Sequence, residues 1–158
     1  MIDVDKVTKK FFNNIAYQID YTANFSKSFR RIFHAKYIGE EIAPDEFFIL
    51  MLLNKNPDFS QADIAKVMFR GKAHIGKILN EMETKGFVTR KYDDSLNYTQ
   101  NVVTPKGAEL FEKGIAQVRG NIISRTNSEF TAEELEQFIS YLKRYRNMLN
   151  SIVEVKLK

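Results

Sequence analysis

The sequence predicts a mainly α-helical fold with one small β-hairpin, and three observations support this prediction. Apolar residues recur at steps of three and four over most of the chain, which is the period of amphipathic helices. One stretch after Gly86 is instead rich in aromatic and β-branched residues, as strands are. Only seven Gly and three Pro interrupt 158 residues, so the helices should be long. The predicted order is four helices, a hairpin and two helices.

The first two predicted helices are separated by a break at Gly39. The first is expected over residues 4–36, which contain neither Pro nor Gly and keep the helical period. The second begins at Pro44, a residue favoured at the first helical position, and two carboxylates follow where they face the positive end of the helix dipole. Residues 47–53 are all apolar, so we expect this second helix to be central and buried.

The third and fourth predicted helices are short and close together. Ser60 is the expected N-cap of the third, with Asp63 at its third helical position. A turn at Arg70-Gly71 leads into the fourth helix, residues 72–85, which Gly86 ends as a left-handed cap. Two short helices joined in this way are typical of a helix-turn-helix.

The hairpin and the last two helices complete the chain. Strands are predicted over residues 87–92 and 98–103, and Thr104-Pro105 then begins a helix. Thr131 and Glu134 form the capping box of the last helix. Its apolar residues alternate steps of three and four, which is typical of a seam against another helix. With three residues of the first helix they form the expected dimerisation set: Leu135, Phe138, Leu142, Tyr145, Leu149, Ile152, Phe12, Ile15 and Ile19.

A hairpin directly after a helix-turn-helix makes a wing, and residues 72–85 have the pattern of a recognition helix. At 100° per residue one arc of this helix holds four apolar residues, Ile75, Ile78, Leu79 and Met82. The opposite side carries small and polar residues with a single lysine, Lys77, which suits insertion in a major groove. From Arg70 to Lys91 there are six basic and two acidic residues, an excess equal to the net charge of +4 of the whole chain. This concentration of charge favours a nucleic-acid surface.

Five short motifs in this order resemble the multiple-antibiotic-resistance regulator (MarR) family. Ala43-Pro44-Asp45-Glu46-Phe47 is similar to the family's Leu-Thr-x-x-Gln-Phe, and residues 60–65 to its Thr-Gln-x-Glu-Leu-Ala. Residues 79–90 resemble Leu-Asp-Arg-Leu-Glu-x-Lys-Gly-Leu-Val-x-Arg, residues 103–107 Leu-Thr-x-x-Gly, and residues 130–134 Leu-Ser-x-Glu-Glu. The resemblance covers residues 42–149.

The resemblance implies a winged helix-turn-helix over residues 42–105 and dimerisation helices over residues 1–38 and 106–158. It implies a homodimer on a pseudo-palindromic operator, commonly a repressor, that releases DNA when a small aromatic or lipophilic acid binds. The expected contacts to double-stranded DNA are Ser60, Gln61, Arg70, Lys72, Ala73, His74, Gly76, Lys77, Asn80, Arg90, Lys91 and Asn97. The residues considered for an effector pocket are Tyr17, Tyr21, Phe25, His34, Phe47 and Phe48; the interpretation favoured by the sequence is that the aromatic residues form the dimer core and that His34 is structural.

The wing departs from the family pattern. The family's Asp-x-Arg, whose Arg enters the minor groove, corresponds here to Ser95 and Asn97, so that cation is missing. Either the wing binds more weakly or Arg90 and Lys91 compensate. The mid-helix Gly76 could serve a close backbone approach to DNA.

Other classes of function are disfavoured by composition. There is no Cys for a disulfide or thiolate metal site. The longest apolar run has seven residues, and the N-terminus does not resemble a signal peptide, so a cytoplasmic protein is expected. The two His lie on different helices, and Gly71-Lys72 has Lys66 where a P-loop needs Gly, so we expect no metal, cofactor or catalysis. The alternative function is a winged-helix module that has lost DNA binding and binds a protein.

Overall fold

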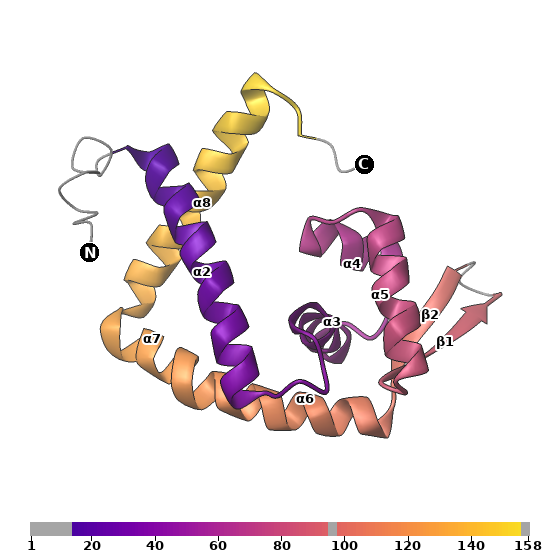
Figure 1. Ribbon diagram of the computed structural model, residues 1–158. Coiled ribbons are helices and arrows are strands. Elements are labelled where there is room, and N and C mark those ends of the chain that lie inside the picture. The colour runs from indigo at the N-terminus through magenta and orange to yellow at the C-terminus, as the bar shows by residue number, and fades with distance from the viewer. Residues whose placement is uncertain (1–13, 95–97, 156–158) are drawn as a thin grey trace. The chain divides into compact units, whose positions relative to one another are not determined.

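The computed structural model describes residues 14–94 and 98–155 of the chain (Figure 1). The chain divides into two compact units, Met1–Pro44 and Asp45–Lys158. The first contains helix α2, and the second contains the other helices and the hairpin. The expected fold class, mainly helical with a two-stranded hairpin, is confirmed. None of the helices in the described ranges is long and apolar enough to cross a bilayer.

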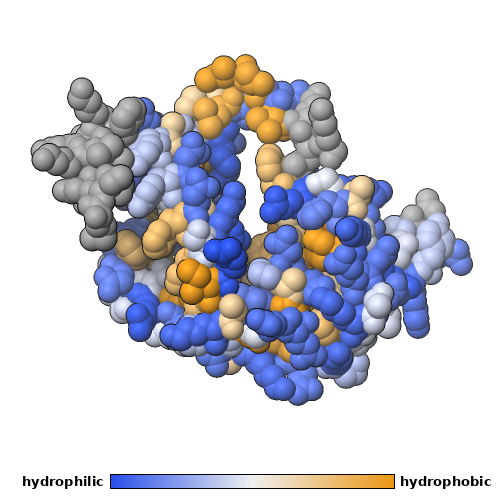
Figure 2. All heavy atoms as spheres, viewed as in Figure 1, coloured by the Kyte–Doolittle hydropathy of each residue, from blue (hydrophilic) through white to orange (hydrophobic). Residues whose placement is uncertain are grey.

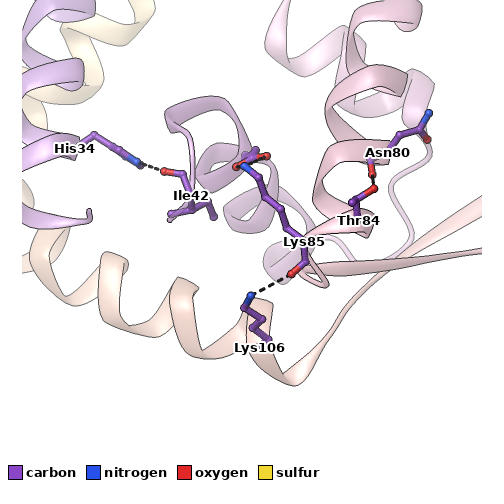
Figure 3. A network of polar contacts seen from close by, with 7 residues as sticks. His34, Ile42, Asn80, Thr84, Lys85 and Lys106 are labelled. Carbon is purple, nitrogen blue, oxygen red and sulfur yellow. Dashed lines mark hydrogen bonds and ion pairs between the residues drawn. The ribbon is translucent and has the colours of Figure 1, made fainter. Parts of the chain in front are cut away.

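The first unit is dominated by helix α2, Ile15–Tyr37. It begins after Asn14, whose side-chain oxygen accepts hydrogen bonds from the amides of the next turn and so satisfies donors that a helix start leaves unpaired. It ends where the loop after it is tied back, since His34 Nε2 lies 2.5 Å from the carbonyl oxygen of Ile42 (Figure 3). The predicted start of this helix at residue 4 lies outside the described residues.

Three helices supply most of the core of the second unit, α3 (Pro44–Lys55), α4 (Gln61–Met68) and α5 (Lys72–Thr84). Helix α3 is the buried element that its apolar run predicts, with Ile49 and Leu50 inaccessible to solvent. Helices α4 and α5 contact each other as the two arms of a helix-turn-helix.

The turn predicted at Arg70-Gly71 lies between α4 and α5. The residue before it, Phe69, has a left-handed conformation with φ +52°. Phe69 is the C-cap of α4, and its left-handed backbone lets the next amide, that of Arg70, donate to the carbonyl oxygen of Ala65 at 2.9 Å. Gly71 is extended and serves as the N-cap of α5. After α5, Gly86 has φ +74°, as the predicted left-handed cap requires.

The hairpin consists of strands β1, Val88–Asp93, and β2, Tyr98–Val103. They are antiparallel, with Val88 opposite Val103 at the base and Asp93 opposite Tyr98 towards the loop. The base is closed by Thr104, whose hydroxyl lies 2.6 Å from the carbonyl oxygen of Gly86. This hydrogen bond holds together the two ends of the hairpin, at Gly86 and Thr104.

Three helical segments follow the hairpin before the last helix. Helix α6 (Pro105–Val118) has Thr104 as its N-cap and passes through a π-turn, η1 (Arg119–Ile123), into α7 (Ser124–Glu129). Together they form the helix that the sequence predicts after Thr104. Helix α8 (Ala132–Ile152) has the predicted capping box, with the Thr131 hydroxyl accepting from the Glu134 amide.

Helix α8 exposes its apolar residues. None of its residues, all of which are described, is buried in the single chain. The space-filling view shows apolar side chains gathered at the C-terminal end of this helix (Figure 2), where Ile152 is 71% exposed. A helix whose apolar side is exposed to water is unusual, because apolar surface in contact with water is unfavourable.

Candidate nucleic-acid interface

Helix α5 has one buried side and one exposed side, as the periodicity of its sequence predicts. The four predicted core residues are all buried, with Ile75, Leu79 and Met82 at 0% exposure. Ala73, Lys77, Asn80 and Thr84 on the opposite side are exposed. The helix therefore presents a small, polar surface with one cation, which is compatible with close approach to a nucleic-acid groove.

Besides Lys77 on this surface, the neighbouring segments carry three exposed cations: Arg70, Lys72 and Lys91. They come from the turn, from the start of α5, and from strand β1. His74 is also exposed, on the first turn of α5. Charge distributed over three adjacent elements of a helix-turn-helix with a wing is the arrangement that phosphate contacts require.

Lys85, which contributes to the basic excess in the sequence, is held by a carboxylate. Its Nζ lies 2.8 Å from each carboxylate oxygen of Glu46, which is only 2% exposed (Figure 3). Lys106 Nζ donates to the carbonyl oxygen of Lys85 at 3.1 Å, and both ammonium groups lie over the ring of Phe87. Lys85 thus joins α3 to the end of α5, and a charge engaged in this way is less available to phosphate.

Ser60 is the N-cap of α4, as predicted. Its hydroxyl accepts from the Asp63 amide at 3.2 Å, and the Asp63 carboxylate accepts from the Ser60 amide at 3.0 Å. Hydrogen bonds from the Ser60 hydroxyl and then from its amide hold the pKa of Asp63 below its usual value. This capping box fixes the start of the helix that supports α5.

Gln61, Asn80 and Arg90, all expected DNA contacts, lie together. Arg90 Nη1 donates to Asn80 Oδ1, and Arg90 Nη2 donates to Gln61 Oε1 at 3.0 Å. Gln61 Nε2 in turn donates to the carbonyl oxygen of Lys72 at 2.8 Å. The structure thus brings together residues of α4, α5 and β1 that are far apart in the sequence.

Gly76 lies beneath this group. A Cβ added at Gly76 would lie 2.7 Å from Gln61 Nε2, closer than real contacts allow. The Gln61 amide occupies the space that Gly76 leaves in the middle of α5. Packing within the protein therefore accounts for this glycine without a contact to DNA.

The wing is anchored by contacts to the loop before α4 that the sequence analysis did not predict. The Tyr98 hydroxyl donates to the carbonyl oxygen of Asp58 at 2.8 Å, and Asn101 Nδ2 contacts that of Phe59 at 3.5 Å. These partners are separated by 40 and 42 residues, so no local pattern could reveal them. Asn97 and Ser95, at the predicted wing tip, lie outside the described residues.

The residues of the predicted effector pocket are distributed over both units. In the first unit Tyr17 and Tyr21 stack with ring centroids 5.9 Å apart, Phe25 is exposed and His34 is buried. In the second unit Phe47 is buried against Phe111, with centroids 6.3 Å apart, and Phe48 is half-buried. The predicted dimerisation residues Phe138, Leu149, Ile152 and Ile15 are exposed, while Leu135, Leu142, Tyr145 and Ile19 are half-buried; Phe12 lies outside the described residues.

This geometry defines a winged helix-turn-helix protein, and comparison with known proteins specifies the class further. The model of the MarR family matches residues 42–95. The fold is similar to that of MepR from S. aureus in a DNA complex (19% identity, 86% of this chain and 96% of that chain, TM-score 0.71). It is also similar to a MarR family protein from Bacillus stearothermophilus (19% identity, 95% and 99%, TM-score 0.62).

A third similar structure is the PcaV transcriptional regulator from Streptomyces coelicolor in complex with its natural ligand (12% identity, 85% and 95%, TM-score 0.68). No curated protein matches the chain by sequence. The resemblance expected from the sequence is confirmed: residues 42–95 match the model of the MarR family, and the chain has the fold of solved MarR-family regulators.

Proposed function

We propose that this chain is a subunit of a homodimeric transcription regulator that binds a specific operator in double-stranded DNA. The observation on which the proposal rests is the exposed side of α5, where Lys77 projects from a helix whose opposite side is buried. In this proposal α5 enters a major groove while Arg70, Lys72 and Lys91 meet phosphates. The similarity in fold to MepR, solved in a DNA complex, supports it.

The homodimer is supported by the terminal helices. The seam of α8 leaves Phe138 58% and Leu149 43% exposed in the single chain, and Ile15 at the start of α2 is 58% exposed. A second copy of the chain would cover such a face by helix packing, and its two-fold symmetry would place two recognition helices on a pseudo-palindromic site. Residues 1–38 and 106–158 are accordingly proposed to dimerise, and residues 42–105 to bind DNA.

We further propose that the regulator is a repressor released by a small aromatic or lipophilic effector. The aromatic residues of the predicted pocket would supply apolar contact to such a ligand, and His34 a polar one. The similarity in fold to PcaV, solved with its natural ligand, is consistent with this. Binding and release of DNA need no catalytic group, and the proposal assigns none.

The proposal is tested with Lys77→Ala. Operators are first selected from genomic fragments with the purified protein, and binding is then measured by mobility-shift titration at fixed salt. We expect Lys77→Ala to weaken operator binding by about 1–3 kcal/mol if the lysine reads a base, and to weaken binding to all DNA uniformly if it meets phosphate.

The matched control is Lys113→Ala, which removes an exposed lysine from α6 and should leave affinity unchanged. Equal binding by Lys77→Ala and the parent would contradict the placement of α5. Failure of the parent to bind any fragment at low salt would favour the alternative, a winged-helix module that engages a protein.

A further inference from the structure

Arg90 lies at the base of the wing, yet its guanidinium points into the protein rather than away from it. Both terminal nitrogens donate to neighbouring side chains, Nη1 to Asn80 and Nη2 to Gln61. Its Nε is buried, without a hydrogen-bond partner among the described residues. The backbone amide of the same residue donates to Glu83 Oε1 at 2.9 Å. Strand β1 is thus fastened at one residue to both helices of the helix-turn-helix.

The orientation of each amide in this cluster is fixed by chemistry. A guanidinium has only donors, so the group that faces it in Asn80 and in Gln61 must be the amide oxygen. The carbonyl of Lys72 is only an acceptor, so Gln61 must present its nitrogen there, and both ends of Gln61 are committed. Both the oxygen and the nitrogen of the Gln61 amide therefore have a partner within the protein.

The two ends of the Asn80 amide differ in their partners. The oxygen accepts from Arg90, which fixes the direction in which it points, and none of the described residues accepts a hydrogen bond from Nδ2. Figure 3 shows the Asn80 side chain extending away from α5. The backbone carbonyl oxygen of Asn80 accepts a hydrogen bond from the Thr84 hydroxyl at 3.0 Å. A free asparagine reads adenine with two bonds, donating to N7 and accepting from N6, and the second of these needs the oxygen.

We propose that Arg90 is a positioning residue which, by holding the oxygen of Asn80, restricts this asparagine to donating hydrogen bonds in the groove. The inference rests on the proposed function. Asn80 then favours a base that presents an acceptor, such as guanine N7 and O6 or thymine O4, and disfavours cytosine, whose N4 amino group is a donor. Adenine loses the advantage of its bidentate contact. Arg90 acts through Asn80 and touches no DNA.

The proposal is tested by selecting preferred sites from a randomised DNA library with the full-length protein, and by measuring the salt dependence of binding. Asn80→Ala identifies the base pair that this residue reads, as the position where preference is lost. In Arg90→Met the oxygen of Asn80 is free, so preference at that pair should move towards adenine by roughly fivefold or more. The salt slope should stay unchanged, because no phosphate contact is removed.

The matched control is Lys91→Met, which removes the neighbouring exposed cation of the same strand. It should lower the salt slope by about 0.9 for one phosphate contact and leave base preference unaltered. If Arg90→Met behaves like Lys91→Met, with a lower slope and the parental preference, Arg90 contacts phosphate and the proposal is wrong.

Two further measurements decide the proposal where Arg90→Met folds poorly or no DNA is bound. Asn80→Asp keeps an acceptor for Arg90 but has no donor, so it should retain the parental Tm and lose the preference for acceptor bases; an unaltered preference overturns the proposal. The second measurement does not depend on DNA. The loss of Tm in the double variant Arg90→Lys/Asn80→Ala should be smaller than the sum of the losses in the two single variants, because both substitutions break the same contact. Additive losses would overturn the positioning role, whereas coupled losses without any DNA binding would reject the proposed function and its base reading together.

Discussion

At the scale of single residues, Gly107 marks the tightest backbone contact between α6 and the hairpin. A Cβ added there would overlap the carbonyl oxygen of Phe87, which is backbone and cannot turn aside as a flexible side chain could. Phe87 itself is inaccessible to solvent and receives the Thr104 amide at the same oxygen, at 3.0 Å. The absence of a side chain at Gly107 therefore lets α6 start directly against the base of the wing.

Replacing Gly107 by Ala tests this contact. We expect Gly107→Ala to lower the free energy of unfolding by about 1–3 kcal/mol, the usual cost of overpacking a tightly packed site. Urea denaturation followed by circular dichroism measures it. Gly120→Ala is the control, because a Cβ there meets open space and Ala favours helix, so this variant should be neutral or slightly stabilised. Equal stability of the two variants would contradict the proposed role of Gly107.

Some properties of single residues follow from local sequence patterns, whereas others depend on tertiary structure. The core side of α5 was predictable from the spacing of Ile75, Ile78, Leu79 and Met82, since helical period is a local property. The engagement of Arg90 was not, because its partners Gln61 and Asn80 lie 29 and 10 residues away. From composition alone a cation near the wing is indistinguishable from a phosphate contact, and only tertiary structure reveals where its guanidinium points.

At the scale of elements, the capping box of α4 should make its stability dependent on pH. The pKa of Asp63 is lowered from 3.8 because the folded state donates hydrogen bonds from Ser60 to its carboxylate. A group whose pKa is lowered by folding contributes stability that is complete above its unfolded pKa and lost as the pH falls through the folded value. The box should therefore stabilise the protein fully at neutral pH and fail only in acid.

We expect Asp63→Asn to reduce Tm at pH 7, with the deficit relative to the parent shrinking as the pH falls below about 3.8. Thermal melts across pH 2.5–8 measure both curves at roughly constant ionic strength. Ser60→Ala removes the other half of the box, typically at a cost of about 1 kcal/mol, and should show the same trend. A deficit that is constant with pH would indicate that the charge of Asp63 contributes nothing.

The sequence predicts helix starts well where an N-cap residue with a side-chain hydroxyl is present. Ser60, Thr104 and Thr131 all cap helices at their expected places, because a hydroxyl at an N-cap is a local signal. The left-handed conformation of Phe69 before the turn into α5 had no local signal, because its side chain disfavours that conformation.

At the scale of the whole molecule, the exposed seam of α8 makes a prediction about assembly. Leu142 lies in the middle of the seam and is half-buried in the single chain. We expect Leu142→Glu to weaken self-association by at least about tenfold, because it would bury a carboxylate in an apolar helix contact. Sedimentation velocity over a range of protein concentrations measures the change.

Asn147→Glu introduces the same charge at an exposed position of the same helix and off the seam, so it should associate like the parent. Two outcomes would contradict the proposed dimer helices: a monomeric parent at all concentrations, or equal association of both variants.

The closure of the hairpin by Thr104 has a mechanical consequence for the molecule. No spare residue separates the strand that returns from the wing, β2, from the first turn of α6, and the hydroxyl of Thr104 is bonded to both Gly86 and Gly107. Helix α6 and the hairpin are therefore joined at Thr104 without a flexible linker between them. We expect a tilt of the start of α6 to displace the hairpin with it.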